Sequence, residues 1–162
     1  MFQKRRVVQL LGRVKVLQDL EGEDLERFAG ACRKVPFGEG DMILNEGDPP
    51  SGFYVVAEGE LRVFLPREVK GKKERRISDV DLNRLREGDC FGEYSLIDRQ
   101  PVSASIRAVR AGSVVLIETE AFLQIIEGDD RIEKIVYRNL LRILVQRLRK
   151  REKEYDFLLL SD

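Results

Sequence analysis

Histidine is absent from the 162-residue sequence, and cysteine occurs only twice. Without histidine the chain cannot build a His-based catalytic triad, most zinc sites, or the histidine-rich metal centre typical of some metalloproteins. Cys32 and Cys90 are too few for a disulfide framework, so they indicate reduced thiols in a cytoplasmic protein. We therefore expect no catalytic residues, no metal site and no tightly bound cofactor.

Long apolar runs are missing as well. The sequence opens with MFQKRRVVQLLGRVKVL, in which basic and apolar residues follow the spacing of an amphipathic helix. No run approaches the roughly 20 residues of a membrane span, and no signal-peptide core with a cleavage site follows. These absences predict no membrane span and a cytoplasmic location.

Neither basic nor acidic residues are in excess, because 29 basic residues balance 29 acidic ones. The charges are nevertheless segregated: residues 19–26 carry only acidic ones, whereas residues 67–76 and 131–153 are mostly basic. A net charge of zero argues against a general nucleic-acid binder.

The length fits one domain over residues 1–162, and the sequence pattern changes twice along it. Helical patterns occupy residues 1–32, and short apolar runs separated by glycines occupy residues 33–119. Such runs, at intervals of roughly 8–12 residues, are typical of an all-β sandwich, barrel or roll. Helical patterns return over residues 120–162.

The carboxyl-terminal part predicts a short helix over 120–126, capped by Thr119, and a long one from Asp129 or Asp130 to about Tyr155. Two apolar stripes run along the long helix, the first made by Ile132, Val136, Leu140 and Ile143, the second by Tyr137, Leu141, Leu144 and Leu148. Together they cover roughly 200° of the helix, more than a small roll can bury. The second stripe therefore predicts a homodimer formed through this helix.

The most informative segment is FGEYSLIDRQPVSASIRA, residues 91–108. A turn glycine, a helix of about one turn and a loop entering a strand would point several backbone N–H groups into one concavity, which suits an anion. Glu93, at the start of that helix, could accept hydrogen bonds from a hydroxyl-bearing ligand such as ribose.

This segment resembles the phosphate-binding cassette of the cyclic-nucleotide-binding domain family, F-G-E-x-[AS]-L followed by P-R-[AST]-A. The family includes the effector domain of the catabolite activator protein and the regulatory subunits of cAMP-dependent protein kinase. The resemblance extends over residues 10–150 and includes Gly40-Asp41, Glu46-Gly47-Asp48, Phe53-Tyr54-Val55-Val56, Glu58-Gly59-Glu60-Leu61 and Gly88-Asp89. It implies an antiparallel β-roll of the jelly-roll type with amino-terminal helices and a long carboxyl-terminal helix.

The resemblance also implies roles for individual residues, with cAMP or cGMP as the ligand. Gly92 and Glu93 would contact the ribose, and Ser95 would lie beside the cyclic phosphate. Ser103 and Ala104 would offer donors to the same phosphate. The expected ligand-binding set is Gly92, Glu93, Tyr94, Ser95, Val102, Ser103 and Ala104.

Val102 departs from the family pattern, because it stands where the family has its phosphate-clamping arginine. A charge-assisted hydrogen bond of that kind contributes roughly 1.5–3 kcal/mol, or about 10- to 150-fold in affinity. Arg99 and Arg107 are the nearest arginines in sequence and are the candidates to replace it.

Two functions follow from these observations. The first is a stand-alone sensor of cAMP or cGMP that signals through its long helix to a second subunit or an unidentified effector protein, without a DNA-binding domain. The alternative is a degenerate family member that binds no nucleotide and serves as a dimerisation or protein-interaction scaffold. Val102, in place of the phosphate-clamping arginine, favours the scaffold.

Overall fold

The computed structural model describes residues 2–160. Met1, Ser161 and Asp162, which belong to the expected domain, lie outside the described residues, as does the side chain of Phe2. The elements in chain order are α1 (Phe2–Leu11), η1 (Lys15–Leu17), α2 (Gly22–Ala31), β1 (Arg33–Phe37), β2 (Met42–Leu44), β3 (Gly52–Leu65), β4 (Val80–Leu85), β5 (Cys90–Phe91), α3 (Glu93–Asp98), β6 (Ser105–Glu118), α4 (Thr119–Glu127) and α5 (Asp130–Leu160).

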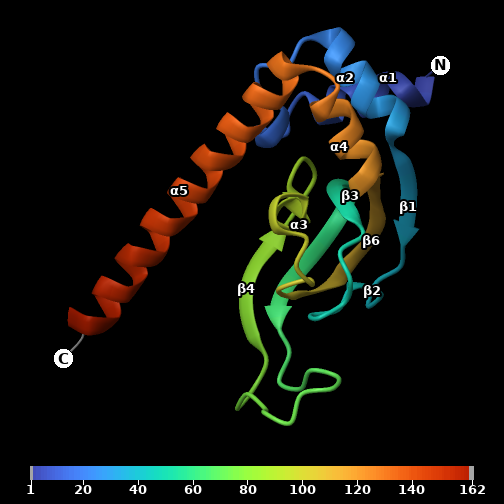
Figure 1. Cartoon of the computed structure of the whole chain (residues 1–162). Helices are drawn as coiled ribbons and strands as arrows, with labels where there is room; N and C mark the ends of the chain where they lie inside the picture. The colour runs from blue at the N-terminus through green and yellow to red at the C-terminus, as the bar shows by residue number, and fades with distance from the viewer. Residues whose placement is uncertain (1, 161–162) are drawn as a thin grey trace.

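Two long strands, β3 and β6, form the centre of the sheet and pair antiparallel from Gly52–Glu118 to Phe64–Ser105. β1 and β2 pair with β6, and β4 and β5 pair with β3, each in the antiparallel sense. α1, α2 and α4 gather at one end of the sheet, and α5 leads away from it (Figure 1). The prediction of an antiparallel β-roll with amino-terminal helices and a long carboxyl-terminal helix is confirmed.

The first five residues of β3 and residues 113–117 of β6 are buried on both faces, because their side chains alternate between two cores. Phe53 and Val55 of β3 pack with the helices, in a cluster that includes Phe28 and Phe122. Tyr54, between them, faces the interior of the roll and stacks on a phenylalanine of β5 with ring centroids 4.7 Å apart. The sheet therefore joins the helical end of the domain to the interior of the roll.

The two long strands bend where glycines meet. Gly59 has a φ of 90°, a conformation that costs other residues free energy, and the pairing of β3 with β6 shifts register around it. Gly112 lies against the carbonyl of Glu58 so closely that a Cβ atom there would collide with it. These bends curl the sheet into a roll.

The helix boundaries differ slightly from the sequence-based expectation. α4 begins at Thr119 itself, and Glu118 occupies the capping position in extended backbone, so the prediction that Thr119 caps this helix is wrong. β6 continues through Glu118, which places the threonine one residue inside the helix. α5 begins at Asp130 as expected but continues to Leu160.

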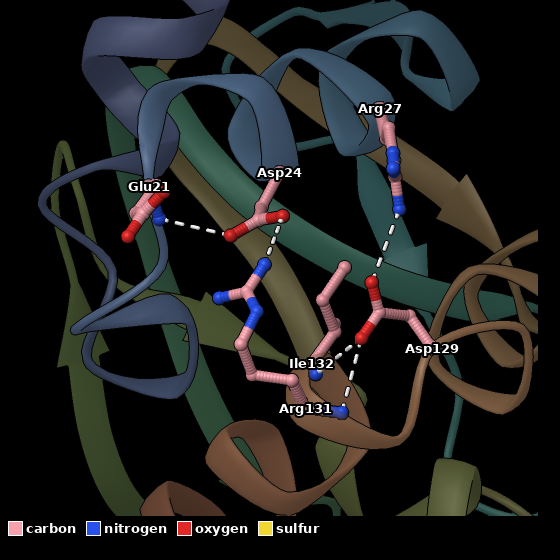
Figure 2. Close-up of polar contacts among 6 residues, drawn as sticks. All are labelled: Glu21, Asp24, Arg27, Asp129, Arg131 and Ile132. Atoms are coloured by element: carbon pink, nitrogen blue, oxygen red, sulfur yellow. Dashed lines mark hydrogen bonds and ion pairs between the residues drawn. The ribbon is translucent and has the colours of Figure 1, made fainter.

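The base of α5 is fixed to α2 by a buried carboxylate (Figure 2). Asp24 is 3% exposed; its Oδ1 accepts a hydrogen bond from Nη2 of Arg131 at 2.7 Å, and its Oδ2 accepts one from the backbone N–H of Glu21 at 3.0 Å. Burial by itself would raise the pKa of Asp24, but the hydrogen bonds from Arg131 and Glu21 and the nearby positive charges lower it overall. The ion pair therefore joins two helices 107 residues apart in sequence.

Two more side chains hold the same half of α5. Asp129 accepts from the backbone N–H groups of Arg131 and Ile132 at the start of the helix, at 3.0 and 3.2 Å (Figure 2). The buried amide of Asn139 donates to the carbonyls of Val16 and Gln18 at 3.1 and 2.7 Å. These contacts satisfy backbone groups that would otherwise be orphaned, so they fix the helix in position as well as in direction.

The far half of α5 projects beyond the roll (Figure 1). Ile132, Val136 and Leu140 of the first expected stripe are buried, whereas Leu141 and Leu148 of the second are 62% and 58% exposed. Within residues 2–160, no helix combines the length and the apolar character that crossing a bilayer requires.

Replacing Asp24 with asparagine is expected to lower the free energy of unfolding by about 1.5–3 kcal/mol at pH 7, because a charged hydrogen bond to Arg131 is lost. The folded state lowers the pKa of Asp24, so its contribution to stability is present above the ordinary carboxyl pKa of about 3.9 and is lost as the pH falls through the folded-state value. Asp24→Asn should therefore lose less stability on acidification than the unsubstituted chain. Denaturant unfolding at several pH values measures both effects.

Asp19→Asn is the matched control. Asp19 also pairs with an α5 arginine, Arg138, at 3.1 Å, but its side chain is 58% exposed. Water screens an exposed pair, so the expected loss is below about 1 kcal/mol. Equal losses in the two variants would show that Asp24 does not anchor α5.

Candidate functional site

The cassette begins with a glycine that the local geometry requires. Gly92 has a φ of 85° and precedes the one-and-a-half-turn helix α3, and a Cβ atom there would collide with the carbonyl of Gly52 in β3. α3 ends at Asp98. The residue that caps it, Arg99, is also left-handed, and its backbone N–H donates to the Ser95 carbonyl at 3.2 Å. The expected order of turn glycine, short helix, loop and strand is confirmed.

The loop that follows α3 is tied to the turn before β3. The backbone N–H of Val102 donates to the Asp48 carbonyl at 2.9 Å, and its carbonyl accepts from the N–H of Gly47 at 2.8 Å. The half-buried Val102 side chain packs against the apolar interior of the roll. Because both backbone groups are occupied, a side chain at this position is held toward the roll.

Glu93 is the buried charge of the cassette, with 4% of its surface exposed. Its carboxylate forms an ion pair with the guanidinium of Arg147, which comes from the far half of α5. The same guanidinium donates to the Tyr94 hydroxyl at 3.1 Å and lies 5.4 Å from the centre of the Tyr94 ring. Burial alone would lower the pKa of Arg147, but the negative charge of Glu93 and the hydrogen bonds raise it, so the group stays positively charged.

The two arginines proposed as substitutes for the missing clamp have other partners. Arg99 donates to Glu120 of α4 at 2.7 Å on the surface. Arg107 donates to the Met42 sulfur at 3.2 Å and lies 5.5 Å from the Phe64 ring centre. The structure brings neither to Glu93, and a phosphate role for them stays a prediction.

The three remaining residues of the expected ligand-binding set differ in how far they are exposed. Ser95 is buried and its hydroxyl donates to the Gln100 carbonyl at 3.3 Å, whereas Ser103 is exposed and Ala104 half-buried. Their ligand roles also stay predictions.

Cys90 lies directly before the cassette and is not poised for redox chemistry. Burial, with a smaller contribution from the charge of Glu93, raises the pKa of its thiol to about 12. A thiol at neutral pH is then protonated and unreactive. No cluster of metal-binding side chains is present among residues 2–160.

Sequence reasoning missed Arg147, which the structure places closest to the expected ribose acceptor. It is one of many basic residues in the second half of α5, and 54 positions separate it from Glu93. No local pattern distinguishes it from its neighbours, because its role depends on where α5 crosses the cassette.

Residues 34–129 match the family model described as cyclic nucleotide-binding domain. The chain is 30% identical over 126 residues to a cAMP-dependent protein kinase regulatory subunit of Emericella nidulans, covering 77% of this chain and 28% of that protein. It therefore spans between a quarter and a third of the length of such curated relatives.

Solved structures share the fold of this chain. The catabolite activator protein of Thermus thermophilus superposes with a TM-score of 0.72 at 28% identity, over 89% of this chain and 62% of that one. A cyclic nucleotide-binding domain from Methylobacillus flagellatus superposes with a TM-score of 0.74 at 21% identity, over 98% and 84%. Together with the cassette and its buried glutamate, the match over more than half of its residues shows that this chain belongs to the cyclic nucleotide-binding domain family.

Proposed function

We propose that this chain is a regulatory, non-catalytic cytoplasmic domain that binds cAMP or cGMP in its cassette and transmits binding through α5. The observation that carries the proposal is the ion pair between Glu93, the expected ribose acceptor, and Arg147 of α5. The ion pair thereby joins Glu93, which would bind the ligand, to α5, which would transmit the signal.

The binding step uses the donors and acceptors of the cassette. Glu93 accepts a hydrogen bond from a ribose hydroxyl, and the backbone around Ser95, Ser103 and Ala104 approaches the cyclic phosphate. A ribose hydroxyl that binds the Glu93 carboxylate shares it with the Arg147 guanidinium or displaces that guanidinium from it. The ligand therefore interacts differently with two positions of α5, which is what coupling requires.

The output step uses the surface that α5 leaves uncovered. Leu141, Val145 and Leu148 are at least 50% exposed and follow one another along the helix. Their burial against the same helix of a second copy would form a homodimer, and an effector protein could use the same stripe.

Calorimetric titration with cAMP and cGMP tests the binding step. We expect saturable heat for at least one of them and a fall in affinity of about tenfold in Glu93→Gln, because a neutral amide is a weaker acceptor than a carboxylate. Glu68→Gln, on an exposed carboxylate that pairs with Arg75 in the loop between β3 and β4, is the control and should leave affinity unchanged. Absence of heat at millimolar ligand would overturn the sensor proposal.

The second candidate is the scaffold without a ligand, which the packing of Val102 in the apolar roll favours. An anion beside this side chain would lose hydration without gaining a positive partner. If no nucleotide binds and sedimentation experiments find a dimer, the scaffold is the better description.

A further inference from the structure

A hollow lies between α1 and the face of the sheet formed by β1, β3 and β6. Its volume is about 780 Å³, and none of the residues that line it belongs to the cassette, residues 91–108. Pockets that hold small molecules typically have volumes of roughly 300–1,000 Å³. The hollow is therefore large enough for a ligand of its own.

Small side chains make the floor of this hollow. Ala29, Cys32, Ala57 and Ser113 line it together with Val115. The Ser113 hydroxyl is buried and has no hydrogen-bond partner among residues 2–160, which is uncommon for a buried polar group. Burial raises the pKa of the Cys32 thiol to about 12, so the floor carries no negative charge.

The rim is charged, with positive groups in excess. The basic residues Lys4, Arg6, Arg13 and Lys34 line the hollow, against the acidic residues Glu58 and Glu87. Arg13 and Glu87 neutralise one another in an ion pair of 3.0 Å. An apolar floor below a net positive rim complements a molecule with an apolar body and one negative end.

We infer that this hollow binds a small amphiphilic organic anion, such as a medium-chain carboxylate. The carboxylate lies at the rim near Lys4 and Lys34, and the hydrocarbon body covers Ala57 and Val115. Because α1 forms one wall and packs on α2, an occupant adds contacts to the helical end of the domain and none to the cassette.

Titration of the full chain with decanoate, followed by amide NMR shifts, tests the inference. We expect saturable shifts at Ala57, Ser113 and α1, and little change in the cassette. Decyltrimethylammonium, with the same chain and the opposite charge, should bind at least tenfold more weakly. Equal binding of the two amphiphiles, or shifts confined to the exposed stripe of α5, would contradict the inference.

Two variants locate the site. Lys34→Glu reverses one rim charge and should weaken decanoate binding by about tenfold, whereas Lys70→Glu, in the loop between β3 and β4, should have no effect. Ala57→Leu fills the floor and should abolish binding; decanoate binding retained in both Lys34→Glu and Ala57→Leu places it elsewhere. The affinity for decanoate should be the same in the unsubstituted chain, in Glu93→Gln and in the presence of cAMP. Failure of the decanoate inference would therefore leave the nucleotide proposal untouched.

Discussion

Replacing Val102 with arginine is expected to raise the affinity for cAMP by about 10- to 150-fold. Val102 stands at the position of the family's phosphate-clamping arginine, and its backbone is held by hydrogen bonds with Gly47 and Asp48. Its side chain already faces the roll, so the arginine stem starts in the right direction. A guanidinium there supplies the two-pronged donor that a phosphate prefers. Isothermal titration calorimetry measures the gain.

Val102→Met separates charge from length. Methionine has a comparable stem without the guanidinium, so its affinity for cAMP should stay at the level of the unsubstituted chain. Thermal unfolding of each variant without ligand measures any stability that is lost when a charge is placed near the apolar interior. If arginine gives no more affinity than methionine, the side chain at position 102 does not reach the phosphate. If the arginine variant binds no cAMP at all, the scaffold hypothesis replaces the sensor.

The fold could be predicted because its signals are local. Glycines such as Gly59 and Gly92 occupy positions where φ is positive, and this requirement marks the turns of the roll in the sequence itself. The stripe of Ile132, Val136 and Leu140 identifies the buried face of α5 through helical spacing alone. Each feature depends on residues a few positions apart.

The contacts that place α5 could not be predicted, because they join distant parts of the chain. Asp24 looks like an ordinary acidic residue in the first turn of a helix, yet it is buried and paired with Arg131. Asn139 lies on the buried face of a helix, where its amide appears unfavourable until the carbonyls of Val16 and Gln18 are placed beside it. Sequence periodicity carries no information on which polar groups meet across helices.

Replacing Arg147 with methionine is expected to free the far half of α5 while leaving its base in place. The substitution removes the ion pair with Glu93 and the hydrogen bond to Tyr94, and it leaves a buried carboxylate without its charged partner. A loss of about 1.5–3 kcal/mol corresponds to roughly 10- to 150-fold faster amide exchange where that contact limits opening. Hydrogen exchange should therefore accelerate over residues 141–149 and change little over residues 130–140, which Asp24 and Asn139 hold.

Arg149→Met is the control for this experiment, because Arg149 is an exposed α5 arginine two residues away and has no ion pair among residues 2–160. Its exchange pattern should match that of the unsubstituted chain. Glu93→Gln combined with Arg147→Met should accelerate exchange little more than Arg147→Met alone, since two residues that act through one contact are not additive. Equal acceleration by Arg147→Met and Arg149→Met would mean that helix propensity, rather than the link to the cassette, sets the mobility of α5. Additive effects of the two substitutions would separate Glu93 from Arg147 and remove the physical basis for signalling from the cassette to the helix.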